Sequence, residues 1–165
     1  MGAIDTILSK FFGDKAKRDL KELMPYADKI QAVYPRFVTL SHDELRAESE
    51  KLKQRVRGTI ATEMGKVEEM KFKMESNELS FDEKESLSNE IDKLKKQIDE
   101  KVEVILDEIL PEAFSIVKET ARRLKENETI VVTANEFDRN LAAKKDFVTI
   151  EGNKDIYKNR WIAGG

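Results

Sequence analysis

Cysteine is absent from this chain of 165 residues, and histidine and tryptophan each occur once. The absence of cysteine excludes disulfides and thiolate metal sites, and it fits a reducing compartment. With one histidine, His42, and no cysteine, the chain has no obvious ligand set for zinc. No Ser-His-Asp or Cys-His arrangement suggests nucleophilic catalysis either. We therefore interpret His42 as a surface residue near the start of a helix.

Proline and glycine are scarce, with three and seven residues, so few positions interrupt secondary structure. Charged residues make up 38% of the chain, which suits long solvated helices better than a barrel or sandwich. No apolar run approaches the roughly 20 residues that a membrane-spanning helix needs, and no signal-peptide cleavage site follows the N-terminus. The net charge of -3 gives no general attraction to nucleic acid. We expect a soluble, mainly α-helical chain without a nucleic-acid partner.

Gly65-Lys66 is the only part of the sequence that partly matches a phosphate-binding loop. A P-loop would also need glycine at position 60 and Ser or Thr at position 67, where Ile60 and Val67 stand. The dipeptide lies within the periodic apolar pattern of a helix, whose amides are paired internally and cannot cradle a phosphate. No catalytic, cofactor-binding or metal-binding residue is therefore assigned.

The first 21 residues combine an apolar face with basic side chains. The i, i+3, i+4 spacing predicts a short amphipathic helix over residues 3–12, ended by Gly13. Asp14 would then cap a second helix that runs to about Val33. The candidate contact residues are Ile4, Ile7, Leu8, Lys10, Phe11, Phe12, Lys15, Lys17 and Arg18. Such a face either lies in an anionic lipid headgroup layer or docks on the rest of the domain, and composition alone favours docking.

The second helix has its own apolar stripe, which we expect to be buried. Its members recur at helical spacing and are Leu20, Leu23, Met24, Ala27 and Ile30. Together, the amphipathic helix and this first long helix make up residues 1–40.

Residues 41–110 predict a long antiparallel helical hairpin. Ser41 with Glu44, and Ser80 with Glu83, have the spacing of capping boxes, which start helices. After each start, apolar residues recur at steps of three or four for about thirty residues. Neither stripe can be buried alone, so the two helices should pack against each other. We favour a structural role for this hairpin over a partner-binding arm.

Pro111 fits the first turn of a following helix over residues 111–126. Residues 127–165 then change character, with a β-branched strand at 129–133, a short helix capped by Asn135 and a β-hairpin over 147–157. A lone two-stranded hairpin is marginal in water. The predicted fold is mainly α: an amphipathic helix, a long helical hairpin, and a small α+β segment that looks truncated.

Three stretches resemble the SecA family of protein translocase motors. They are residues 1–14 followed by 20–30, the segment LSHDELRAESE at 40–50, and the segment LDEILPEAFSIVKETARR at 106–123. The last is the most specific, and all three occur in the order that the family has.

Two segments depart from the usual family pattern. Residues 57–105 are inserted between the second and third stretches, and residues 127–165 form a second extra piece. Both additions resemble those of SecA proteins from the Bacteroidetes lineage. The resemblance therefore indicates the N-terminal part of a SecA variant with insertions.

The resemblance implies a multidomain ATPase that drives preproteins through the SecY channel, with two RecA-like nucleotide-binding domains and Mg-ATP as cofactor. The family's ATP-site residues lie beyond position 165, so this fragment would bind no cofactor and would be inactive alone. The family is cytoplasmic and peripherally associated with the inner membrane.

In the family, the first helix contacts acidic phospholipids and the channel, and it contributes to homodimer contacts. This shifts our interpretation of the nine candidate residues towards membrane or translocon contact. The other partners implied are the preprotein and the remainder of the motor. The alternative is a free-standing coiled-coil scaffold or adaptor, which the long hairpin favours and the 106–123 segment disfavours.

Overall fold

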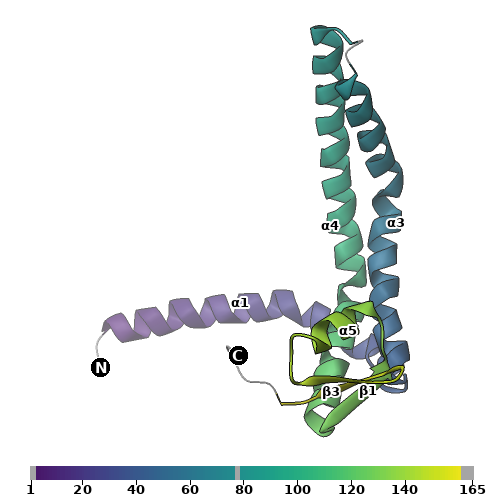
Figure 1. Cartoon of the computed structure of the whole chain (residues 1–165). Helices are drawn as coiled ribbons and strands as arrows, with labels where there is room; N and C mark the ends of the chain where they lie inside the picture. Colours follow the sequence, from purple (N-terminus) through teal and green to yellow (C-terminus); the bar gives the residue numbers. More distant parts are fainter. Residues whose placement is uncertain (1–2, 77–78, 161–165) are drawn as a thin grey trace.

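A computed structural model describes residues 3–76 and 79–160, without the side chains of residues 3–14, 16 and 17. Its elements are α1 (Ala3–Val33), α2 (Pro35–Val38), α3 (His42–Glu75), α4 (Phe81–Glu126), β1 (Thr129–Thr133), α5 (Glu136–Ala142), β2 (Val148–Glu151) and β3 (Lys154–Lys158). The helices α3 and α4 form a long antiparallel arm (Figure 1). The sheet and α5 lie at the base of the arm, and α1 leaves the base across the direction of the arm. The expected fold class, mainly α with a small β component, is confirmed.

Both arm helices begin at the capping boxes that the sequence predicts. The Ser41 hydroxyl accepts a hydrogen bond from the Glu44 amide at 3.2 Å, and the Glu44 carboxylate accepts one from the Ser41 amide at 2.7 Å. Ser80 and Glu83 repeat the exchange at 3.3 and 2.8 Å. Each box satisfies two N–H groups that a helix start leaves unpaired, which explains why α3 and α4 start where they do.

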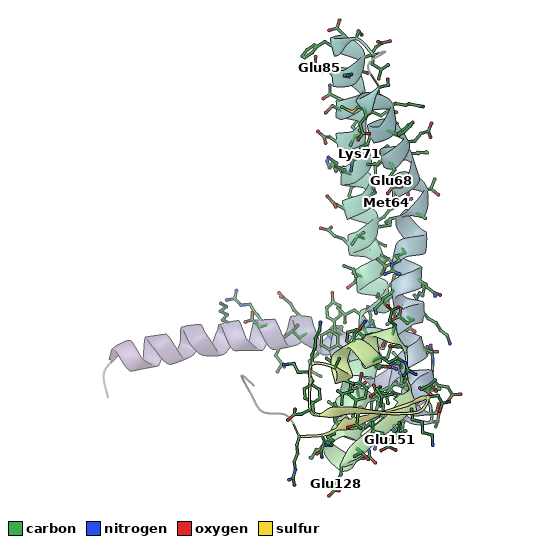
Figure 2. All side chains as sticks on the ribbon, in the orientation of Figure 1. Met64, Glu68, Lys71, Glu85, Glu128 and Glu151 are labelled. Carbon is green, nitrogen blue, oxygen red and sulfur yellow. The ribbon has the colours of Figure 1, made fainter. Side chains whose placement is uncertain are left out.

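The seam between the arm helices is apolar. Val67 of α3 is buried with Ile91 and Ile98 of α4. Partly buried residues extend this cluster, namely Ile60, Met70, Met74, Leu94 and Val102. The outside of the arm carries mainly polar and charged side chains (Figure 2). The antiparallel pairing inferred from two matched stripes is thus confirmed.

A second apolar cluster joins the helices at the base. Phe37 of the short helix α2 is fully buried at its centre. The other buried members come from α3 and α4 and are Leu45, Leu52, Ile105, Ile109 and Ile116. Val33 of α1 and Leu40 pack against the same cluster. This arrangement brings the first four helices together at one point.

The predictions that one helix ends at Gly13 and that another begins at Pro111 are wrong. The helix α1 continues through Gly13 and Asp14, and α4 continues through Pro111. One glycine costs a helix about 1 kcal/mol relative to alanine, which is too little to end a helix that continues on both sides. An internal proline costs about 3 kcal/mol, but Ile109 and Ile116 on either side of Pro111 are buried in the base cluster and offset that cost.

The prediction that the apolar stripe of α1 is buried is also largely wrong. Leu20, Leu23 and Met24 are exposed, and only the last turns of the helix approach α4. There the Ser115 hydroxyl lies 3.3 Å from the Ile30 carbonyl oxygen, to which it donates. Helical spacing predicts that a stripe exists but does not show which part of it meets a partner within the same chain.

The predicted strand and β-hairpin form a single sheet. The strand β3 pairs antiparallel with both β1 and β2, which gives the order β1-β3-β2. Gly152 takes the left-handed conformation (φ 62°) that the tight β2–β3 turn requires. The short helix α5 is capped by Asn135 as predicted, since its side chain accepts from the Asp138 amide at 3.0 Å. Because it has a third strand, this sheet is more stable than the marginal two-stranded hairpin that the sequence suggested.

Candidate functional site

The nine candidate contact residues all lie on α1. The structure describes the side chains of only two of them, Lys15 and Arg18, and both are exposed. The side chains of the other seven lie outside the described residues: Ile4, Ile7, Leu8, Lys10, Phe11, Phe12 and Lys17. Figure 1 shows that this part of α1 lies away from the base of the arm. The interpretation as a membrane or translocon contact stays a prediction. No helix in the described ranges is both long and apolar enough to cross a bilayer.

A buried carboxylate on α4, Glu119, connects the helices at the base. It is fully buried and accepts hydrogen bonds from Arg122 at 2.6 Å, Arg123 at 2.7 Å and the Tyr34 hydroxyl at 2.8 Å. The bond from Arg122, helped by those from Arg123 and Tyr34, outweighs the opposing effect of burial and lowers the pKa of Glu119 from 4.5 to about 2. Glu119 is therefore ionised at neutral pH and ties the end of α1 to α4.

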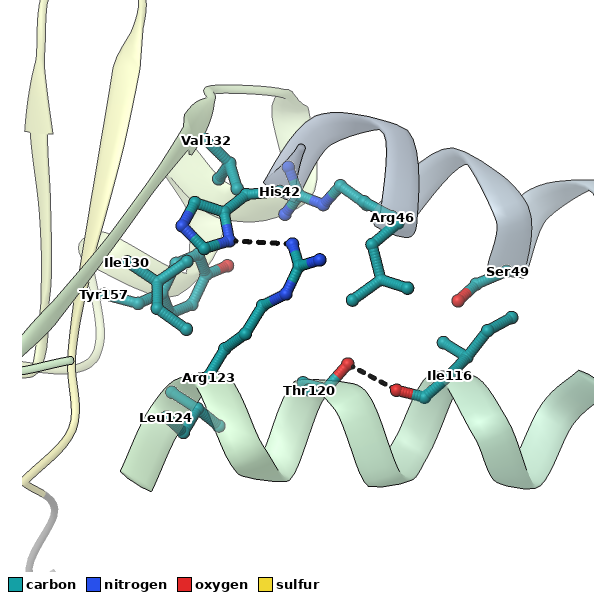
Figure 3. Close-up of a pocket in the computed structure, with 11 residues that line it drawn as sticks. His42, Arg46, Ser49, Ile116, Thr120, Arg123, Leu124, Ile130, Val132 and Tyr157 are labelled. Carbon is teal, nitrogen blue, oxygen red and sulfur yellow. Dashed lines mark hydrogen bonds between the residues drawn. The ribbon is translucent and has the colours of Figure 1, made fainter. Parts of the chain in front are cut away.

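Arg123, one turn beyond Glu119, holds the connection between α2 and α3. Its Nη2 donates to the carbonyl oxygens of Leu40 at 2.6 Å and Phe37 at 3.2 Å. Carbonyls at a helix end lack partners within the helix, so a buried guanidinium is well suited to satisfy them. Its Nη1 lies 3.1 Å from Nδ1 of His42 (Figure 3). His42 is thus half-buried against Arg123, which corrects its interpretation as a simple surface residue.

A cavity of about 330 Å³ lies between α3, α4 and the sheet (Figure 3). Its apolar lining comes from all three and consists of Leu45, Ile116, Leu124, Ile130 and Val132. Two polar groups on its walls are already engaged: Arg123 binds Glu119 and backbone carbonyls, and Thr120 donates to the Ile116 carbonyl at 2.8 Å. The cavity is therefore better suited to an apolar group than to a phosphate.

A second buried carboxylate, Asp138 of α5, attaches the sheet segment to α3. Arg46 of α3 forms two hydrogen bonds with it, one of them from Nη1 to Oδ2 at 2.8 Å. The Asn135 amide and the Tyr157 hydroxyl also donate to it, at 2.8 and 2.7 Å. Burial raises the pKa of Asp138, but these hydrogen bonds outweigh burial and the pKa falls from 3.8 to about 2. Asp138 is therefore a charged anchor inside the protein.

Asp43 adds a further contact between α3 and the sheet segment. Its two carboxylate oxygens accept from the amide and hydroxyl of Thr133, at 2.8 and 2.7 Å. Arg46 also donates to the Thr133 carbonyl at 3.2 Å. The first turns of α3 thus hold the end of β1 through both backbone groups of Thr133. Sequence patterns do not reveal these contacts, because the partners are about ninety residues apart.

No group of three or more His, Asp or Glu residues in the described ranges could hold a metal ion. Gly65 and Lys66 lie well inside α3, where the helix uses the backbone amides that a phosphate would need.

Comparison with known proteins connects these features to one family. The family model for the SecA DEAD-like domain matches residues 8–144. Protein translocase subunits SecA from Parabacteroides distasonis and Phocaeicola vulgatus are both 52% identical to the chain over 96% of its length. The SecA subunit from Christiangramia forsetii is 40% identical over 100% of the chain. The chain spans about 14% of the length of the first two relatives and 15% of the third. The search of solved structures returned no match.

These matches first place the chain in the class of DEAD-like domains. More particularly, the chain belongs to the SecA family. The resemblance inferred from three short stretches is thereby confirmed. The aligned regions cover 96% of the chain in the Parabacteroides and Phocaeicola proteins, so most of residues 57–105 and 127–165 is shared with them. That these two segments are insertions relative to the usual family pattern stays a prediction.

Proposed function

We propose that this chain is the N-terminal portion of a protein-translocating ATPase that drives preproteins through a SecY-type channel. Its role in that machine is to brace the first RecA-like nucleotide-binding domain and to contribute contacts at the membrane. The support is the match to the SecA DEAD-like domain and the names of the relatives, which are protein translocase subunits. Residues outside this chain would bind Mg-ATP, so the isolated chain should show only background ATP hydrolysis. Turnover clearly above background would contradict this part of the proposal.

The observation that carries the bracing role is a second apolar stripe on α4. Ile109 and Ile116 face the base cluster, whereas a different set of apolar residues on the same helix is exposed. These residues are Leu106, Phe114, Val117 and Leu124. Large exposed apolar patches commonly mark an interface. We assign this stripe to the remainder of the motor, since the relatives are about seven times as long as the chain.

The bracing role is tested by comparing two exposed phenylalanines. Phe114→Ser alters the α4 stripe, and Phe72→Ser alters a still more exposed phenylalanine near the tip of the arm. In the isolated chain, neither change should shift the free energy of unfolding by more than about 0.5 kcal/mol. In the full-length protein, Phe114→Ser should lower the midpoint of thermal unfolding and the translocation-coupled ATPase rate, whereas Phe72→Ser should not. A full-length protein that tolerates both changes equally would contradict the bracing role.

The proposed membrane contact belongs to the first half of α1. This helix extends away from the base, and its exposed Lys15 and Arg18 follow the apolar positions 4, 7, 8, 11 and 12. Apolar residues flanked by cations suit an anionic lipid surface. The resulting location is cytoplasmic and peripheral to the inner membrane, and the same face is a candidate for SecY and homodimer contacts.

Vesicle flotation tests the lipid contact. The chain should float with vesicles that contain anionic phospholipid and not with neutral vesicles, and Phe11→Ser with Phe12→Ser should abolish flotation. Phe72→Ser is the matched control and should float normally. Equal binding to both vesicle types, or no binding to either, would contradict an electrostatic membrane contact.

A free-standing coiled-coil scaffold or adaptor is the second candidate. The observation that favours it is the exposure of Phe72 and Phe81 near the arm tip, at 77% and 82%. The gene itself distinguishes the two candidates. A reading frame that continues past codon 165 into a glutamine motif and a P-loop supports the motor, and a stop codon there supports the scaffold.

A further inference from the structure

Two buried carboxyl groups share one arginine where the sheet meets α3. Asp138 of α5 and Asp155 of β3 are both fully buried. Arg46 is ion-paired with Asp138, whose oxygens also accept from Tyr157 and Asn135. Both oxygens of Asp155 lack a hydrogen-bond partner among the described residues. One guanidinium balances only one of two negative charges, so the second carboxyl group has no counterion there.

The position of Asp155 in the sheet makes an unpaired charge especially unfavourable. In the antiparallel register, Asp155 lies opposite Val132 of β1 and Ile150 of β2. Residues directly opposite each other project from the same face of a sheet. On this face, Val132 and Ile130 line the apolar cavity beside α3 and α4. A carboxylate among such neighbours has lost its water without gaining a partner, whereas a neutral carboxylic acid fits.

The charged groups around Asp155 have other partners. On α3, Arg46 binds Asp138, and Asp43 accepts from Thr133. On β3 itself, the Tyr157 hydroxyl donates to Asp138. On α5, Arg139 donates to the Gly152 carbonyl at the exposed turn. The adjacent strands β1 and β2 present Val132 and Ile150 to Asp155. A proton is therefore the simplest way to neutralise Asp155.

We propose that Asp155 is protonated in the folded protein at neutral pH, and that this proton is a pH-sensitive latch that keeps the sheet and α5 docked on the start of α3. When Asp155 loses its proton to solvent, two buried carboxylates face a single arginine. Their repulsion favours opening of the segment 129–158, which returns Asp155 to water. Burial, together with the charge of Asp138, raises the pKa of Asp155, in agreement with this arrangement.

The direction of the pH effect follows from linkage. A carboxyl group whose pKa is raised on folding stabilises the folded state at pH values below its ordinary pKa, and this contribution is lost as the pH rises through the folded-state pKa. The latch is therefore tightest in acid. It loosens progressively as the pH rises from the ordinary pKa to the folded-state pKa of Asp155, and it loosens no further above that value.

Hydrogen exchange and infrared spectroscopy on the whole chain test the latch. Infrared spectra at neutral pH should contain the C=O stretch of a protonated carboxylic acid, and Asp155→Asn should remove it. Between the ordinary pKa and the folded-state pKa of Asp155, the opening equilibrium of segment 129–158, corrected for intrinsic exchange, should rise up to tenfold per pH unit, and it should level off above the folded-state pKa. In Asp155→Asn, which resembles the protonated acid, the same equilibrium should not change over this pH range.

Two further variants complete the test. Asp146→Asn changes an exposed aspartate just before β2 and should behave as the wild type in both measurements. Asp138→Asn frees Arg46 to pair with Asp155, so the carboxylic acid band should disappear at neutral pH. The absence of the band from the wild-type spectrum would overturn the proposal, whether or not the variants fold. An Asp155→Asn protein with the pH dependence of the wild type would overturn it as well.

Discussion

Nε of Arg123 lies 2.7 Å from Oε1 of Glu119, one helical turn earlier on α4, and both side chains are buried. The same arginine holds the carbonyls of Phe37 and Leu40, and the same glutamate accepts from Tyr34. The pair therefore connects α4 to α1, to α2 and to the start of α3. Apolar contacts bring these helices together, and the Glu119–Arg123 pair fixes the positions of their ends relative to α4.

Breaking this pair should be costly. Glu119→Gln leaves Arg123 buried without its counterion, and removing one partner of a buried ion pair typically costs about 3–5 kcal/mol. We expect a loss of about 3 kcal/mol in the free energy of unfolding, measured by urea titration. Glu126→Gln, which removes an exposed partner of Arg122, is the control and should cost less than about 1 kcal/mol. A Glu119→Gln protein as stable as this control would show that the pair is not a structural anchor.

Acid should weaken the same region. The pKa values of Glu119 and Asp138 both fall to about 2 in the folded protein, from 4.5 and 3.8. Their contribution to stability is present above those ordinary values and is lost as the pH falls towards 2. The midpoint of thermal unfolding should therefore drop between about pH 5 and pH 2, and the drop should be smaller in Glu119→Gln. Equal acid sensitivity in both proteins would assign the effect to other carboxylates.

The sheet segment should detach from α3 when its anchor is removed. Arg46→Ala leaves Asp138 buried without a cation, so hydrogen exchange in residues 129–158 should accelerate at least tenfold. Exchange at Val67 and Ile91 in the arm should stay unchanged, because the arm has its own apolar cluster. Arg139→Ala, which removes an exposed hydrogen bond to Gly152, is the control and should leave exchange as in the wild type.

The arm should depend on its seam and not on its exposed apolar residues. Ile91→Ala creates a cavity beside Val67 and should cost about 2–5 kcal/mol in arm stability. Phe81→Ala removes a larger side chain, yet it should cost less than about 0.5 kcal/mol because Phe81 is exposed. Hydrogen exchange along α3 and α4 distinguishes the two changes, and similar effects of both would mean that Phe81 packs against the arm.

Local features of the fold could be predicted from the sequence. The capping boxes at Ser41 and Ser80 and the cap at Asn135 act within three residues of themselves, so their patterns suffice. Sequence patterns erred at Gly13 and Pro111 because burial of neighbouring residues, or plain helix continuation, outweighed a local breaker.

The contacts that assemble the base could not be predicted in the same way. Tyr34 and Glu119 are 85 residues apart, and Arg46 and Asp138 are 92 apart. In a chain in which 38% of residues are charged, periodicity gives no reason to choose one arginine or glutamate over its many alternatives. Similarly, Asp155 stands out only once the register places it between Val132 and Ile150.

The continuity of α4 through Pro111 has a mechanical consequence. This single helix of 46 residues, on the order of 70 Å long, runs from the arm tip to the residues that hold α1, α2 and the start of α3. Because the rod has no joint between its two ends, a small tilt of the base sweeps the tip through a much larger arc. Any reorientation of the base is therefore amplified into a larger displacement of the arm tip.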